Sequence, residues 1–218
     1  MTNHNHNPIE ALKNACHDAC HERHACTHGY KELMQSQDAT SIAAVWRKYW
    51  RELVSEQYAD IICEELPHHY YELKDGFNRA GVFFNECPSS YMNRSFVLIG
   101  NSDNPIHIYG HAEAHVLGNA LVIAHDHARV SCVQPQGKIE LLDYSQGDIT
   151  AGYTIARNRS SLHAATDCEC YNSSVVTITH GILTDHGHLR ISAYQDALVD
   201  SFTENLITLY DNATLTLR

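Results

Sequence analysis

The sequence predicts an α+β protein in which an N-terminal helical module is followed by a β-solenoid, a single-stranded β-helix of eight-residue repeats. Apolar residues recur at helical spacing up to about residue 80 and at every second position from residue 82 onward. Three octads then follow one another without a gap over residues 110–133. We therefore expect a helical module at 1–80, short strands with a linker or cap at 81–105, and a solenoid at 106–218.

The helical module carries start and stop signals. A first helix is expected to begin after Asn7, an N-cap residue that is followed by proline, and to continue until Gly29 interrupts it. A second helix restarts around 38–41, with an apolar stripe at 3–4 spacing that includes Trp46. A further helical stretch ends at Gly81, because glycine is typical of a helix C-cap.

Strands are predicted at 82–84 and 96–99, and the octads follow them. Each octad has a two-residue corner of Gly or Asp plus His or Asn, and then small or β-branched residues at positions three, five and seven. A strand this short cannot bury its apolar face alone, so successive coils must stack. Two octads per coil (about 16 residues) and three (about 24) both fit the pattern, and a β-sandwich of short strands is the alternative fold. The octads open at Gly110, Gly118, Asp126, Gly187, Gln195, Thr203 and Asp211.

The octads at Gly118 (Gly-Asn-Ala-x-Val-x-Ala) and Asp211 (Asp-Asn-Ala-x-Leu) lie behind a Cys-containing helix. This combination resembles a group of uncharacterised proteins of gut anaerobic bacteria and their phages. Those proteins have a helical head and an octad-repeat β-solenoid tail of the form Ala-x-Val-x-Ala-x-Asp/Gly-Asn. The resemblance implies the same order of parts here and carries over no catalytic residue.

Composition narrows the classes of function. The formal net charge of −11 provides no overall attraction for phosphate groups, so we expect no direct binding of nucleic acid. No apolar run approaches the roughly 18 residues of a membrane helix. Eight cysteines and no signal-peptide pattern indicate free thiols in a reducing cytoplasm. Seventeen histidines make the surface charge sensitive to pH near the imidazole pKa.

The first candidate site is a stripe of Cys16, Cys20 and His24, which lie at i, i+4 and i+8 of the first predicted helix. Sulfur and imidazole ligands at such spacing can hold zinc, and no other cofactor is indicated. The alternative is that the two cysteines are small core residues and that the histidines are helix surface.

The second candidate is the histidine population of the repeats. His111, His127 and His188 occupy corner position two, where a turn role is enough to explain them. Ladders of histidines on stacked coils could instead chelate a cation or form a pH-sensitive face. In the same region Cys168 and Cys170 should point to one side and are interpreted as packed thiols, with redox or metal chemistry as the alternative. The histidines concerned are His107, His111, His115, His125, His127, His163, His180, His186 and His188.

Enzyme signatures such as a Gly-x-Ser-x-Gly elbow or a His-Glu-x-x-His helix do not occur, so no catalytic residue is assigned. The function expected is a non-enzymatic binding or scaffold protein, of phage or mobile-element origin by its resemblance, whose rigid acidic solenoid face meets a protein or small-molecule partner. The alternatives are a solenoid transferase acting on a small molecule and a zinc protein organised by the N-terminal stripe. An acidic solenoid that mimics nucleic acid is a further alternative. An uncovered last strand also predicts a homodimer.

Overall fold

The computed structural model has the predicted α+β fold, with helices followed by a β-solenoid of about eight coils. It describes residues 7–23, 27–50, 59–134, 136–187, 190–201 and 206–218. Two compact units are present, Met1–Phe84 and Asn85–Arg218. Among the described helices, none is both long enough and apolar enough to span a bilayer.

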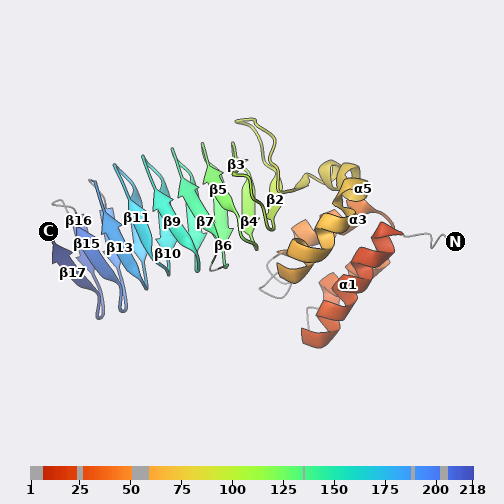
Figure 1. Ribbon diagram of the computed structural model, residues 1–218, viewed down its shortest axis with the longest axis horizontal. Helices are drawn as coiled ribbons and strands as arrows, with labels where there is room; N and C mark the ends of the chain where they lie inside the picture. Colours follow the sequence, from red (N-terminus) through yellow and green to blue (C-terminus); the bar gives the residue numbers. More distant parts are fainter. Residues whose placement is uncertain (1–6, 24–26, 51–58, 135, 188–189, 202–205) are drawn as a thin grey trace. The chain divides into compact units, whose positions relative to one another are not determined.

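Helices dominate the first unit (Figure 1). The side chain of Asn7 accepts a hydrogen bond from the Ile9 amide at 3.1 Å, which confirms the expected N-cap. The expected end of this helix at Gly29 is wrong, because Gly29 lies inside the next helix. The elements of the unit are α1 (Pro8–Arg23), α2 (Thr27–Gln35), α3 (Ala39–Lys48), the π-helical turn η2 (Ile61–Glu65), α5 (Leu66–Arg79) and β1 (Val82–Phe84).

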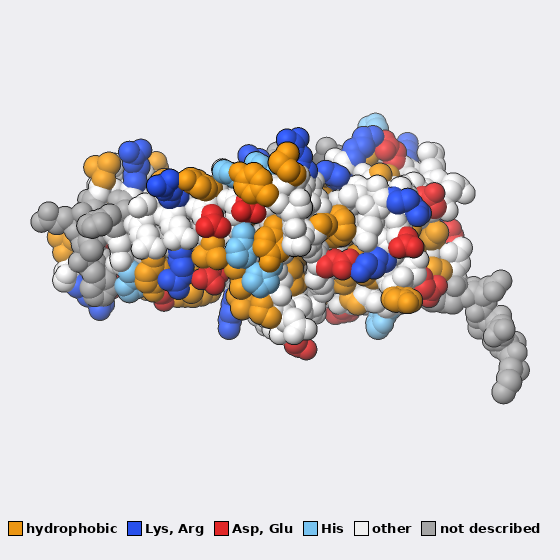
Figure 2. Space-filling model, turned by 90° about the horizontal axis from the view of Figure 1, so that it is seen from above, with side chains coloured by type: hydrophobic (Ala, Val, Ile, Leu, Met, Phe, Trp, Pro, Cys, Tyr) orange, Lys and Arg blue, Asp and Glu red, His pale blue; other side chains and the backbone are white. Residues whose placement is uncertain are grey.

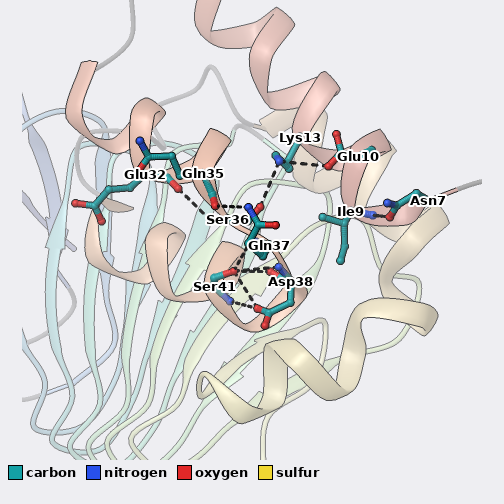
Figure 3. Close-up of polar contacts among 10 residues, drawn as sticks. All are labelled: Asn7, Ile9, Glu10, Lys13, Glu32, Gln35, Ser36, Gln37, Asp38 and Ser41. Carbon is teal, nitrogen blue, oxygen red and sulfur yellow. Dashed lines mark hydrogen bonds and ion pairs between the residues drawn. The ribbon is translucent and has the colours of Figure 1, made fainter.

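A reciprocal cap starts α3 (Figure 3). Asp38 Oδ1 accepts from the Ser41 amide at 2.7 Å, while Ser41 Oγ accepts from the Asp38 amide at 3.2 Å. At the end of α5, Gly81 has φ +70°, the left-handed conformation expected after a helix C-cap. The buried Trp46 ring meets Phe77 edge-on at 5.6 Å, so α3 and α5 share one core.

The solenoid consists of short strands that alternate between two sheets (Figure 1). Even-numbered strands from β2 to β16 form one sheet in sequence order, and odd-numbered strands from β3 to β17 form the other. The strands are β2 (Phe96–Ile99), β3 (Ile106–Ile108), β4 (Glu113–Val116), β5 (Leu121–Ala124), β6 (Arg129–Cys132), β7 (Lys138–Leu141), β8 (Gln146–Ile149), β9 (Tyr153–Ala156), β10 (Ser161–Ala164), β11 (Cys168–Cys170), β12 (Val175–Ile178), β13 (Ile182–Asp185), β14 (Arg190–Ala193), β15 (Leu198–Ser201), β16 (Leu206–Leu209) and β17 (Thr214–Leu217).

Each coil therefore takes two strands, which decides between the two coil lengths left open by the sequence. Glu113 pairs with Arg129 one coil later, and Ser161 pairs with Val175, so these coils take 16 and 14 residues. Every pairing from β2–β4 to β15–β17 is parallel. Parallel pairing between strands of successive coils is the pattern of a solenoid. A sandwich would instead be built from antiparallel hairpins.

The core lies between the two sheets and is filled by the inward octad positions. Ala112, Ala114 and Val116 of the first octad are each at most 1% exposed. Gly147 takes an inward place where neighbouring coils have Val130 and Leu162, and a Cβ there would meet Leu141 Cδ1 at 2.7 Å. Large neighbours thus fill the space that this glycine leaves.

Two inward positions near the C-terminal end are polar. Asp185 and Ser201 are fully buried, and the Ser201 hydroxyl donates to Asp185 Oδ2 at 2.7 Å. The Gly187 amide donates to Asp185 Oδ1 at 2.9 Å, so both carboxylate oxygens have a donor. In the last coil the inward residues Leu209 and Leu217 are 40% and 68% exposed, while the octad start at Thr203 lies outside the described residues.

Candidate functional site

The corner that leads from an odd strand to the next even strand has the same backbone conformation in successive coils. Gly110, Asp126, Asp143, Asn158 and Asn172 all have φ between +56° and +69°. Gly, Asn and Asp tolerate this left-handed conformation best, which explains their place at octad position one. Asp126 Oδ2 also accepts from the Gly110 amide at 2.9 Å, so the corners are bonded from coil to coil.

Because the corners stack, the side chains at position two form a column along the solenoid. His111 and His127 have parallel rings 5.1 Å apart, and Tyr144 stacks on His127 at 5.3 Å. Arg159 Nη1 then donates to the Tyr144 hydroxyl at 2.6 Å. We refer to His111, His127, Tyr144 and Arg159 as the corner column.

A loop from the chain segment before β2 covers the start of this column. Tyr91 lies edge-on to His111 and to His127, with both ring centroids 6.0 Å away. The Asn93 carbonyl accepts from the His111 amide at 2.7 Å, which fixes the loop to the first corner. Tyr91 and Met92 remain 56% and 72% exposed, so an apolar tip adjoins the corner column.

A second row of rings occupies the position immediately before the corner. Tyr109 stacks on His125 at 4.9 Å, and His125 Nε2 lies 3.0 Å from His107 Nδ1, close enough to share a proton. Further along the row, the Arg157 guanidinium lies 4.4 Å from the Tyr171 ring centre, and His186 stacks on Tyr171 at 4.6 Å. Two rows of ring-bearing side chains therefore run along the solenoid, one on each side of the stacked corner residues. The face seen in Figure 2 shows histidines among hydrophobic side chains over the solenoid.

A carboxylate network lies on the odd-strand sheet beside this second row. Glu169 accepts from the hydroxyls of Tyr153 and Tyr171, the latter at 2.6 Å, and these bonds lower the pKa of Glu169. Burial, and then the bond to Glu169, raise the pKa of Tyr153. Because both shifts hold each group in its ordinary ionisation state at neutral pH, the network is suited to fixing side chains and not to exchanging protons.

The two cysteines of β11 point into the core. Cys168 and Cys170 are free thiols and at most 1% exposed, which agrees with their interpretation as packed residues. The neighbouring Cys168 and then burial raise the pKa of Cys170, so its reactive thiolate is disfavoured.

The predicted zinc stripe is described only in part. Cys16 is fully buried in α1, whereas the side chain of Cys20 and the whole of His24 lie outside the described residues. Within the described residues, no three His, Cys, Asp or Glu side chains are placed to hold a metal ion. Zinc binding by Cys16, Cys20 and His24 stays a prediction.

Sequence reasoning identified His111 and His127 but not the tyrosines between which they lie. Tyr144 occupies octad position two in a part of the chain where the octad pattern is weak, and Tyr91 lies in a loop outside the repeats. The signal for the second row was present, since Tyr109, His125, Tyr171 and His186 all precede a corner residue. His188, the third predicted corner histidine, lies outside the described residues.

Comparisons of this chain with protein-family models, with curated proteins and with solved structures gave no match.

Proposed function

We propose that this chain is a binding protein whose solenoid holds a partner protein against the corner column and the Tyr91 loop. One observation carries the proposal: rings at 5.1 and 5.3 Å spacing lie on a corner whose backbone is hydrogen-bonded between coils, next to an exposed apolar tip. Tyrosine and arginine are enriched among the residues that supply most of the binding energy of protein interfaces, and tyrosine offers a large contact area at low entropy cost.

The chemistry of the column indicates what the partner carries. Arg159 offers guanidinium donors at one end, and Tyr91 with Met92 offers apolar contact at the other. The carboxylate of Asp126 is held by the Gly110 amide. The partner segment should therefore combine a carboxylate with an apolar or aromatic side chain.

We also propose that this chain is related to the bacterial and phage proteins that its sequence resembles, which have a helical head and an octad-repeat solenoid tail. The order of parts in this chain supports that likeness, since helices precede a solenoid with corner residues of the Asp/Gly type.

The test is selection of a displayed random-peptide library on the immobilised full chain. Enriched peptides should contain acidic and aromatic residues and should bind the double variant His127→Ala/Tyr144→Ala about tenfold more weakly. The matched control is Tyr194→Ala/Tyr210→Ala, which removes a ring pair stacked at 4.4 Å elsewhere on the solenoid and should leave binding unchanged. Absence of enrichment, or equal loss in both double variants, would contradict the proposal.

A further inference from the structure

A serine and a histidine meet on the outer face of the even-strand sheet, away from the corner column. His115 of β4 lies opposite Ser131 of β6, and Glu113 of β4 lies opposite Arg129 of β6. Residues two apart on a strand share a face, so these four side chains form one outward cluster. The buried residues Ala114 and Val130 between them point inward.

One hydrogen bond and the close approach of one carboxylate connect three of the four side chains. His115 Nδ1 lies 2.6 Å from Ser131 Oγ, and His115 Nε2 lies 3.3 Å from Glu113 Oε1. His115 is 8% exposed, and its ring packs against the Phe96 ring with 4.9 Å between centroids. The ring is therefore held in place by the Ser131 hydroxyl and by Phe96, with the Glu113 carboxylate nearby.

The carboxylate selects the tautomer of the imidazole. With the proton on Nε2, the positive end of the N–H dipole lies near the Glu113 carboxylate without forming a hydrogen bond to it, and the lone pair of Nδ1 faces the Ser131 hydroxyl. The opposite tautomer would turn a lone pair toward the carboxylate, which is unfavourable. The negative charge of Glu113 thus favours the form in which His115 can accept the serine proton, although Glu113 acts through its charge and not through the hydrogen bond that the carboxylate of a carboxylate–histidine–serine triad makes.

We propose that Ser131 is a nucleophile for acyl transfer from small esters, with His115 as its general base and Glu113 as the positioning residue. Ser131 Oγ forms a bond to the ester carbonyl carbon as its proton passes to His115. The ester C–O bond then breaks, and the leaving alcohol takes that proton. Water hydrolyses the acyl-serine by the same route, releasing the acid and restoring the hydroxyl.

Two charged residues beside Ser131 act on the negative oxygen that develops in this reaction. Arg129 precedes Ser131 by two residues on the same face and supplies a guanidinium to stabilise the negative charge. Asp148 lies opposite Ser131 in the next coil, within 3.2 Å of His163 Nδ1, and its carboxylate opposes the negative charge. Asp148→Asn should therefore speed the reaction, a gain that a purely structural role of the cluster would not produce.

The test uses the full chain and a fluorophosphonate probe, with which Ser131 Oγ forms an O–P bond as fluoride leaves and the proton passes to His115. Intact-mass and peptide analysis should show one adduct, at Ser131, that is absent in Ser131→Ala. His115→Gln should slow labelling about a hundredfold, since a general base contributes at least that much. Glu113 is half exposed, so Glu113→Gln should fold normally and still label more slowly than wild type. Hydrolysis of p-nitrophenyl acetate should follow the same order.

The matched control is Ser192→Ala. Ser192 occupies the same outward row of the sheet, but it lies between Thr177 and Thr208 and has no histidine opposite it. Labelling should be unchanged in this variant. No adduct at Ser131, labelling at Ser192 of equal rate, or an unchanged rate in both Glu113→Gln and His115→Gln would overturn the proposal.

Discussion

Replacing Gly110 by alanine should destabilise the first coils of the solenoid and loosen the loop that carries Tyr91. Gly110 has φ +69°, and left-handed backbone costs an alanine about 1–2 kcal/mol. An added Cβ would also lie 2.4 Å from the Ser90 carbonyl oxygen and 2.6 Å from that of Tyr91. Backbone must move to relieve such overlap, which costs about 1–3 kcal/mol. We expect a total loss of about 2–5 kcal/mol in the free energy of unfolding.

Asn158→Ala separates the two contributions. Asn158 occupies the equivalent corner with φ +61°, so alanine there adds the left-handed strain that asparagine tolerates better, and loses one hydrogen bond from Asn172, without any overlap against the loop. Urea unfolding followed by the β-sheet circular dichroism signal should show a larger loss for Gly110→Ala than for Asn158→Ala. The intrinsic fluorescence of Tyr91, measured against a Tyr91→Phe reference, should also change only in Gly110→Ala. Equal stability losses in the two variants would refute the close approach of the loop to this corner.

Three further predictions concern other parts of the chain. Burial raises the pKa of Cys132, and the neighbouring Cys168 together with burial raises the pKa of Cys170. Iodoacetamide should therefore modify Cys132 and Cys170 only after unfolding, whereas the partly exposed Cys63 should react in the folded protein. Hydrogen bonds from Tyr153 and Tyr171 lower the pKa of Glu169, so its contribution to stability is complete above the ordinary carboxyl range and is lost as the pH falls through the lowered value. The stability difference between wild type and Glu169→Gln should accordingly be largest at pH 7 and shrink below about pH 4; a gap independent of pH would contradict the network. Leu206 and Leu217 are exposed on the last strands of the two sheets, so light scattering at micromolar concentration should show a homodimer that Leu217→Lys shifts toward monomer.

The fold could be predicted from the sequence because the helical spacing of apolar residues and their alternation in strands are both properties of neighbouring residues. Alternation places Ala112, Ala114 and Val116 on one face whatever the neighbouring coil contains, and the structure buries all three. The start of α1 was accessible for the same reason, since Asn7 bonds to an amide only two residues away. Gly29 does not end a helix but lies inside α2, because one glycine inside a helix costs only about 1 kcal/mol, which tertiary packing overrides.

The candidate sites depend on a quantity that the octad pattern leaves open, the number of residues in a coil. With two octads per coil, His115 meets Ser131 and His111 meets His127, 16 residues apart in each case. With three octads, His115 would face Ile139, and no serine–histidine pair would exist at this position. Coil length also varies along the chain, from 17 residues at Arg129 to 14 at Ser161, so even a correct mean period would place later neighbours wrongly. The lengths of the corners therefore decide which outward side chains of successive coils become neighbours. Deleting one corner residue between β4 and β6 so that the pairing register of the two strands shifts should abolish the reaction of Ser131, because His115 would no longer lie opposite it.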